Sequence, residues 1–81
     1  MPCVHKIGSV KIEVYGRDHL PPHFHAIYGD ERVLIEIETL AVYAGVIPDK
    51  QLRKVIGWAK EEGNQARLLA IFKEWNPRYF R

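Results

Sequence analysis

The residues best suited to chemistry lie in one short segment, Asp18-His19-Leu20-Pro21-Pro22-His23-Phe24-His25. Three of the four histidines of the chain fall inside it, beside a carboxylate. Histidine titrates near neutral pH and is the commonest metal ligand in proteins. Because the two prolines fix backbone φ angles, the segment can hold its histidines together at a reduced entropic cost. We therefore expect a functional site built from Asp18, His19, His23 and His25.

A divalent metal site is one chemistry that suits this cluster. His23 and His25 are two residues apart, so on a β-strand both side chains would project from the same face. Together with His19 and Asp18, they could bind Zn²⁺ or another transition metal. The spacing matches no established zinc signature, and no cysteine pair accompanies it.

Acid–base catalysis without a metal is a second interpretation. One imidazole could remove a proton while a second, protonated imidazole donates one, as RNA cleavage through the 2′-hydroxyl requires. Lys11 or Arg17 could then stabilise the charge that develops on the phosphate. Two further interpretations stay open: the histidines could form structural cross-strand pairs with glutamates, or a partner-binding surface without catalysis.

Length and composition restrict the class of protein. The chain has 81 residues, of which 47% are hydrophobic and 27% charged, so we expect one folded domain and not a disordered chain. No apolar run approaches the roughly 18 residues of a membrane span. A single cysteine, Cys3, cannot form an internal disulfide, which suits a reducing cytoplasm. A domain this short has a modest core, and it is a candidate for self-association.

Charge is distributed unevenly along the chain. Residues 1–40 carry four Lys/Arg and six Asp/Glu, whereas residues 41–81 carry eight and four. A basic second half could attract RNA or an acidic protein, although solvated helix faces are often basic too. Lys50, Arg53 and Lys54 form the densest basic group, which hints at phosphate contact.

The first half of the chain follows a hydrophobic period of two, which is typical of half-buried strands. Strands are expected at residues 4–7, 10–15, 24–28 and 33–38, with a further short strand at 40–43. A hairpin centred between Asp30 and Glu31 would place the apolar residues of the third and fourth strands on one face.

The same register fixes the pairs on the opposite face of this hairpin. It places His25 opposite Glu36 and His23 opposite Glu38. These carboxylates would orient the imidazoles and raise their pKa values. We therefore expect Glu36 and Glu38 to support the site.

The second half follows a period near 3.6 and predicts two helices. Asp49 is expected to cap the first, Gly63 to end it, and Asn64 to cap the second. Asn76-Pro77 is expected to stop the second helix. The fold class is therefore α+β, with an antiparallel sheet of about four short strands packed against two C-terminal helices.

Across its full length the chain resembles a bacterial family, domain-of-unknown-function family four-one-six-zero, whose hallmark is D-H-x-P-P-H-x-H. Here the hallmark falls on Asp18, His19, Pro21-Pro22, His23 and His25. Further similar positions are Met1-Pro2, Ile35-x-Ile37-x-Thr39, Gly45-x-x-Pro48, Leu52, Val55, Trp58 and Trp75. One departure is Leu40-Ala41-Val42, where many relatives have Gly-Glu-Val.

The resemblance implies a prokaryotic, cytoplasmic protein that is often encoded beside a second small protein. Some relatives are described as DhiT-type toxins of toxin–antitoxin modules, which implies a small antitoxin-type partner. We therefore expect a toxin component that acts on RNA or translation through its histidine cluster. The alternative is a non-catalytic metal- or partner-binding regulatory module.

Overall fold

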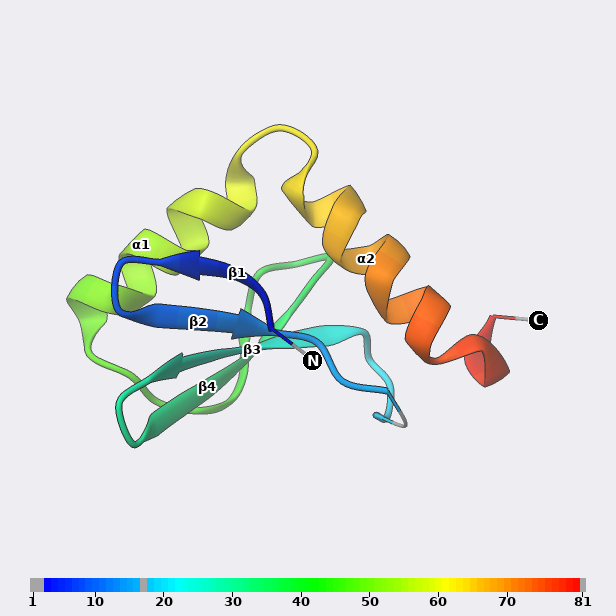
Figure 1. Cartoon of the computed structure of the whole chain (residues 1–81), viewed down its shortest axis with the longest axis horizontal. Coiled ribbons are helices and arrows are strands. Elements are labelled where there is room, and N and C mark those ends of the chain that lie inside the picture. The colour runs from blue at the N-terminus through cyan, green and yellow to red at the C-terminus, as the bar shows by residue number, and fades with distance from the viewer. Residues whose placement is uncertain (1–2, 17, 81) are drawn as a thin grey trace.

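The computed structural model describes residues 3–16 and 18–80, which form one five-stranded sheet and two α-helices (Figure 1). The strands are β1 (Cys3–Ile7), β2 (Val10–Glu13), β3 (His23–Tyr28), β4 (Glu31–Glu36) and β5 (Val42–Gly45). They are followed by α1 (Asp49–Lys60), α2 (Asn64–Trp75) and the short 3-10 helix η1 (Pro77–Tyr79). The predicted α+β class is confirmed, with one strand more than the expected four.

The sheet is an antiparallel meander in the order β1-β2-β3-β4-β5. Alternate residues of the central strands are apolar, so the sheet has one face that must be buried. Both helices pack on that face (Figure 1). The fully buried core is Val10, Ile12, Val14, Phe24, Ala26, Val33, Ile35, Ile37, Ile47, Val55, Ala59, Leu68 and Phe72.

The predicted faces of the β3–β4 hairpin are confirmed, but its predicted register is wrong by two residues. Tyr28 pairs with Glu31, so the loop consists only of Gly29 and Asp30. Gly29 has a φ of +59°, the conformation that a tight two-residue loop needs and that glycine adopts without strain. A shift of two residues keeps every side chain on its face. The apolar pattern therefore could not distinguish the two registers.

The helix limits differ slightly from those predicted. Pro48 and not Asp49 occupies the N-cap position of α1, and Asp49 lies in the first turn. Helix α1 already ends at Lys60, and Gly63, with a φ of +87°, precedes α2 as its N-cap residue. Asn64 is the first residue of α2, and its Nδ2 donates to the Trp58 carbonyl of α1 at 2.7 Å. This side chain therefore satisfies a carbonyl at the end of one helix rather than capping the next.

A loop over residues 14–22 connects β2 to β3 and contains a cis Leu20–Pro21 peptide bond. This loop lies at the end of the sheet where β3 begins (Figure 1), and it contains Asp18 and His19. Within residues 3–16 and 18–80, no helix is long and apolar enough to cross a membrane.

Candidate functional site

Strand β3 places His23 and His25 on the sheet face opposite the core, because they alternate with the buried Phe24 and Ala26. This face is nevertheless closed locally: His23 is 1% exposed and His25 8%. Tyr15 lies with its ring at 79° to the His25 ring, and their centroids are 4.6 Å apart. The centroid of the His23 ring lies 5.9 Å from that of the core residue Phe72. The two imidazoles are therefore shielded from solvent, and His23 borders the apolar core.

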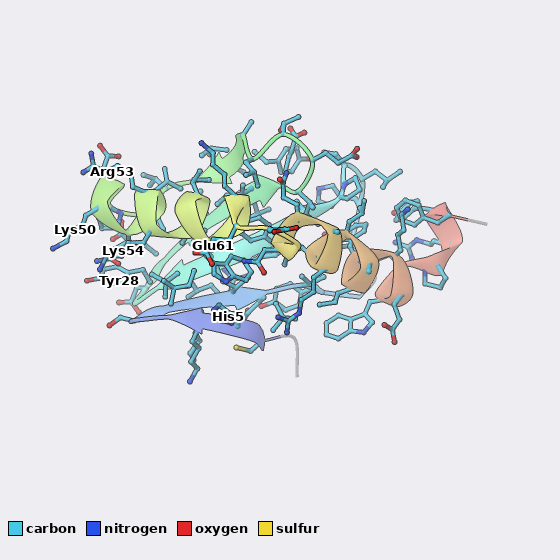
Figure 2. The ribbon with its side chains drawn as sticks, turned by 90° about the horizontal axis from the view of Figure 1, so that it is seen from above. His5, Tyr28, Lys50, Arg53, Lys54 and Glu61 are labelled. Atoms are coloured by element: carbon cyan, nitrogen blue, oxygen red, sulfur yellow. The ribbon has the colours of Figure 1, made fainter. Side chains whose placement is uncertain are left out.

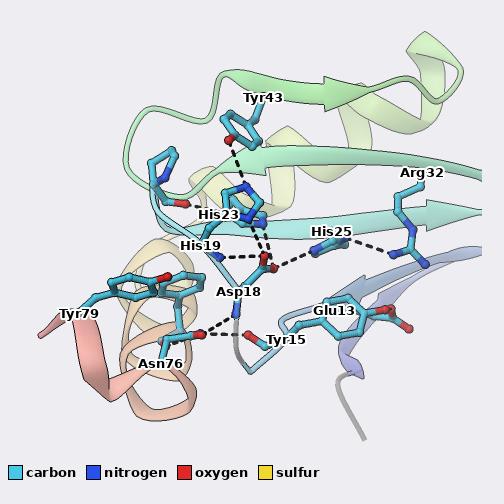
Figure 3. A network of polar contacts seen from close by, with 12 residues as sticks. Glu13, Tyr15, Asp18, His19, His23, His25, Arg32, Tyr43, Asn76 and Tyr79 are labelled. Atoms are coloured by element: carbon cyan, nitrogen blue, oxygen red, sulfur yellow. Dashed lines mark hydrogen bonds and ion pairs between the residues drawn. The ribbon is translucent and has the colours of Figure 1, made fainter.

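One carboxylate from the loop serves both imidazoles (Figure 3). Asp18 Oδ2 lies 2.9 Å from His23 Nε2 and 3.3 Å from His25 Nε2. The Asp18 side chain is 15% exposed. The predicted meeting of two imidazoles with a carboxylate is thus present, but the carboxylate is Asp18 and not a glutamate of β4.

The ring nitrogens of His23 have different surroundings. Nδ1 lies 2.8 Å from the carbonyl oxygen of Pro21, which can only accept, so Nδ1 carries a proton. Nε2 belongs to a side chain that is 0% exposed, and it has no hydrogen-bond partner among the described residues. The contact between Nε2 and Asp18 Oδ2 at 2.9 Å is an ion pair when the ring is protonated, but it does not meet the geometry of a hydrogen bond. When the ring is neutral, Nε2 carries no proton, and its buried lone pair lies close to Asp18 Oδ2.

His25 lies between Asp18 and Arg32. Arg32 Nη1 is 3.4 Å from His25 Nδ1, and a guanidinium only donates, so Nδ1 accepts and Nε2 donates to Asp18. Burial lowers the pKa of His25 below its ordinary value of 6.5, and the charges of His23 and Arg32 lower it further. The hydrogen bond to Asp18 opposes this shift. A neutral His25 is therefore favoured.

Asp18 is held in its charged form. Partial burial by itself would raise the pKa of this carboxyl. The hydrogen bonds from the His25 ring and the His19 backbone, together with the positive charge that His23 and His25 carry when protonated, outweigh burial. As a result, the pKa of Asp18 lies below its ordinary value of 3.8.

His19 lies at the rim of the site. Its side chain is 60% exposed, and its Nδ1 lies 3.3 Å from Asp18 Oδ1. On the other side of the ring, Nε2 is 3.1 Å from the hydroxyl of Tyr43 on β5. His19 thus contacts Oδ1 of Asp18, whereas His23 and His25 contact Oδ2. Unlike those two histidines, His19 is exposed to solvent.

The predicted supporting residues do not make the contacts expected of them. His23 pairs with Glu36 in the sheet, but Glu36 Oε1 accepts from the Thr39 hydroxyl at 3.4 Å. His25 pairs with Leu34 and not with Glu36, and Glu38 lies beyond the end of β4. The predicted pairs of His25 with Glu36 and of His23 with Glu38 are therefore wrong, because of the two-residue register shift.

The two cations that the sequence suggested for the site are Lys11 and Arg17. Lys11 is exposed on β2 and pairs with Ile27. It lies on the same face of the sheet as His25, two residues along β2 from Glu13, which is the residue that pairs with His25. Arg17 lies outside the described residues.

Four residues that shape the site are not indicated by the sequence patterns: Tyr15, Arg32, Tyr43 and Asn76. Arg32 lies between the strands expected at 24–28 and 33–38, but in the actual register it belongs to β4 and is a diagonal neighbour of His25, within reach of a long side chain. Tyr43 stacks over His23 with the ring centroids 5.6 Å apart. Asn76 was interpreted only as part of a helix stop. No local sequence signal identifies Tyr43 or Asn76, because both reach the site through tertiary packing.

The group Asp18, His23 and His25 has the composition of a metal site. One potential ligand atom from each residue lies within 4.8 Å of the other two. The Oδ2–Nε2 distances of 2.9 and 3.3 Å are close to the edge of a zinc tetrahedron, about 3.3 Å for bonds of roughly 2.0–2.1 Å. His19 is not part of this group.

The described part of the chain contains no pocket. Away from the site, Lys50, Arg53 and Lys54 project from the first half of α1 (Figure 2). All three are exposed.

The fold and the site define a small α+β domain with a histidine–aspartate cluster at one end of its sheet. The chain belongs to the family described as "Domain of unknown function (DUF4160)", whose model matches residues 10–75. No curated protein and no solved structure shows significant similarity to it.

Proposed function

We propose that the domain is a metal-binding module in which Asp18, His23 and His25 bind one divalent transition metal ion. Two imidazole nitrogens and one carboxylate oxygen form a donor set that suits Zn²⁺. Three protein ligands leave one position of a tetrahedron for water or a further group. The low exposure of the three side chains favours a structural or regulatory metal over an open hydrolytic centre.

The observation that carries this proposal is that His23 Nε2 is buried 2.9 Å from Asp18 Oδ2 and forms no hydrogen bond among the described residues. An unprotonated ring nitrogen that faces a carboxylate oxygen in a buried place is costly, unless a proton or a cation lies between the two atoms. The hydrogen bond from Nδ1 to Pro21 leaves Nε2 unprotonated in the neutral ring, as a metal ligand requires. A cation between Nε2 and Asp18 Oδ2 would satisfy both atoms, and it would link the 14–22 loop to β3.

Zinc titration of the metal-free protein tests the proposal. At a free Zn²⁺ concentration of 100 times Kd, binding should stabilise the fold by about 2.7 kcal/mol. For a domain of this size, that corresponds to a rise in Tm of roughly 10–20 °C, which chelator should reverse. His25→Ala should abolish the rise, whereas His19→Ala, the matched histidine variant at the exposed rim, should retain it. An unchanged Tm in wild type, or equal losses in both variants, would contradict the proposal.

A toxin that acts on RNA is a second candidate function, favoured by a separate observation. Asp18 Oδ1, His19 and the Tyr43 hydroxyl form an exposed relay with distances of 3.3 and 3.1 Å. In such an arrangement the carboxylate orients the imidazole, which can then exchange a proton with a hydroxyl group. The open surface suits a macromolecular substrate, and a small antitoxin-type protein would be the partner that covers it.

His19 separates the two functions. A toxin of this kind should arrest growth and cleave RNA when expressed, and His19→Ala should remove both effects while zinc binding persists. Expression without growth arrest, or full toxicity of His19→Ala, would count against this second candidate.

A further inference from the structure

We infer that Asn76, at the C-terminal end of α2, is a positioning residue for the Asp18 carboxylate. This inference rests on the proposed metal site. The two histidine ligands belong to β3, so the sheet fixes them. Asp18 belongs to a loop without regular secondary structure, so another element has to hold it in place.

The side chain of Asn76 is tied to the loop and to its own helix at once. Its Oδ1 accepts the backbone N–H of Asp18 at 2.8 Å. Its Nδ2 donates to the carbonyl oxygens of Tyr15 and Phe72, each at 3.0 Å. Asn76 is 2% exposed, so these bonds form away from solvent. Figure 3 shows the amide beneath the loop, on the side of Asp18 away from the histidines.

Two neighbouring contacts dock the same loop on the end of α2. A Cβ atom at Gly16 would lie 3.3 Å from the carbonyl oxygen of Trp75, so the loop backbone lies close to the helix terminus. Arg78 Nη2 donates to the carbonyl oxygen of Asp18 at 3.3 Å. Both the N–H and the C=O of Asp18 are therefore held by residues that follow α2.

The chemistry of this position selects an amide. The loop presents one donor, the N–H of Asp18, and one acceptor, the carbonyl of Tyr15, and an asparagine side chain can satisfy both at once. A carboxylate would lack the donor, and an aliphatic side chain would leave both loop groups buried without partners. Asn76 therefore fixes the position of Asp18 relative to His23 and His25, although Asn76 is far from these residues in sequence.

Cobalt titration of the full chain tests this role, because the visible absorption of Co²⁺ reports its ligand set and geometry. Asn76→Ala should weaken Co²⁺ binding about 10–100-fold, the range typical for residues that orient metal ligands. Its spectrum should shift toward that of Asp18→Ala. Leu68→Ala, which removes core packing earlier in the same helix, should lower stability but keep the wild-type affinity and spectrum.

Hydrogen exchange of wild type gives a second measurement that does not depend on folding of a variant. The backbone N–H of Asp18 donates to Asn76 Oδ1, and bound metal should slow its exchange by about 10-fold or more. Wild-type Co²⁺ affinity and spectrum in Asn76→Ala, or an unchanged Asp18 exchange rate in metal-loaded wild type, would overturn the positioning role alone. Absence of any saturable Co²⁺ spectrum in wild type would overturn the metal site itself and this role with it.

Discussion

The guanidinium of Arg32 contacts His25 Nδ1 at 3.4 Å, on the side of the ring opposite Asp18 (Figure 3). This contact selects the tautomer in which Nε2 carries the proton and donates to Asp18. A metal on Nε2 requires the other tautomer, with the proton on Nδ1 facing a cation. In the proposed site Arg32 therefore competes with metal binding.

Replacing Arg32 with an acceptor should strengthen metal binding. In Arg32→Glu, the carboxylate could accept the Nδ1 proton of His25, as carboxylates commonly do behind zinc-bound histidines. We expect a gain in Zn²⁺ affinity of about 10-fold or more, measured by competition with a chelating dye. Arg53→Glu makes the same charge change on the exposed surface of α1 and is the control. If both variants gain equally, net charge and not the tautomer of His25 is responsible.

Acidification should destabilise the metal-free protein in two ranges of pH. The pKa of His25 is lowered by burial and by its neighbours His23 and Arg32, despite the opposing hydrogen bond to Asp18. The unfolded chain therefore binds a proton near pH 6.5 that the folded chain resists, and stability falls as the pH drops below this value. Because the pKa of Asp18 is depressed, its contribution is present above pH 3.8 and is lost as the pH falls through the folded pKa.

Urea unfolding at a series of pH values measures this effect. His25→Gln should flatten the loss below pH 6.5 and leave the loss at lower pH in place. If the free energy of unfolding of wild type increases when the pH is lowered from 7 to 5.5, the pKa of His25 is not lowered by folding.

Leu40 should prefer replacement by glycine over replacement by alanine. It has a φ of +61°, which is strained for a residue with a Cβ, and its side chain packs against the core. Both substitutions remove this packing, but only glycine relieves the strain of about 1–2 kcal/mol. Leu40→Gly should therefore be about 1 kcal/mol more stable than Leu40→Ala after the greater chain entropy of glycine is included. Equal or reversed stabilities in urea would show that the φ of Leu40 costs nothing.

Two glycines with positive φ should respond very differently to alanine. A Cβ at Gly45 would lie 2.2 Å from the backbone oxygen of Arg32, whereas at Gly29 it would meet nothing within 4 Å. Gly29→Ala should cost about 1 kcal/mol from backbone strain alone. Gly45→Ala adds a clash with the neighbouring strand and should cost about 3–5 kcal/mol. Similar unfolding midpoints for the two variants would contradict the close approach of β5 to β4 at Gly45.

The sequence was sufficient for the faces of the strands and for the cluster itself. Periodicity two puts His23 and His25 on one face whatever the register, and Asp18 is near in sequence. The partners of these residues depended on the length of the hairpin loop. A loop of two residues, Gly29 and Asp30, moved both glutamates away from the predicted pairs, and it brought Arg32 within reach of His25.

The contribution of the C-terminal half to the site could not be predicted from local patterns. The pattern Asn76-Pro77 correctly predicts the end of α2. The side-chain amide of Asn76, however, contacts Asp18, which is 58 positions away in sequence. Such a contact depends on how α2 crosses the sheet, and hydrophobic periodicity only says which face is buried.

The most direct test of the metal site is anomalous diffraction at the zinc edge from crystals of the protein grown with Zn²⁺. We expect one ordered peak at roughly 2.0–2.2 Å from His23 Nε2, His25 Nε2 and an Asp18 oxygen. A peak bound by His19 without His23, or well-ordered His23 and His25 with no peak between them at saturating zinc, would contradict it.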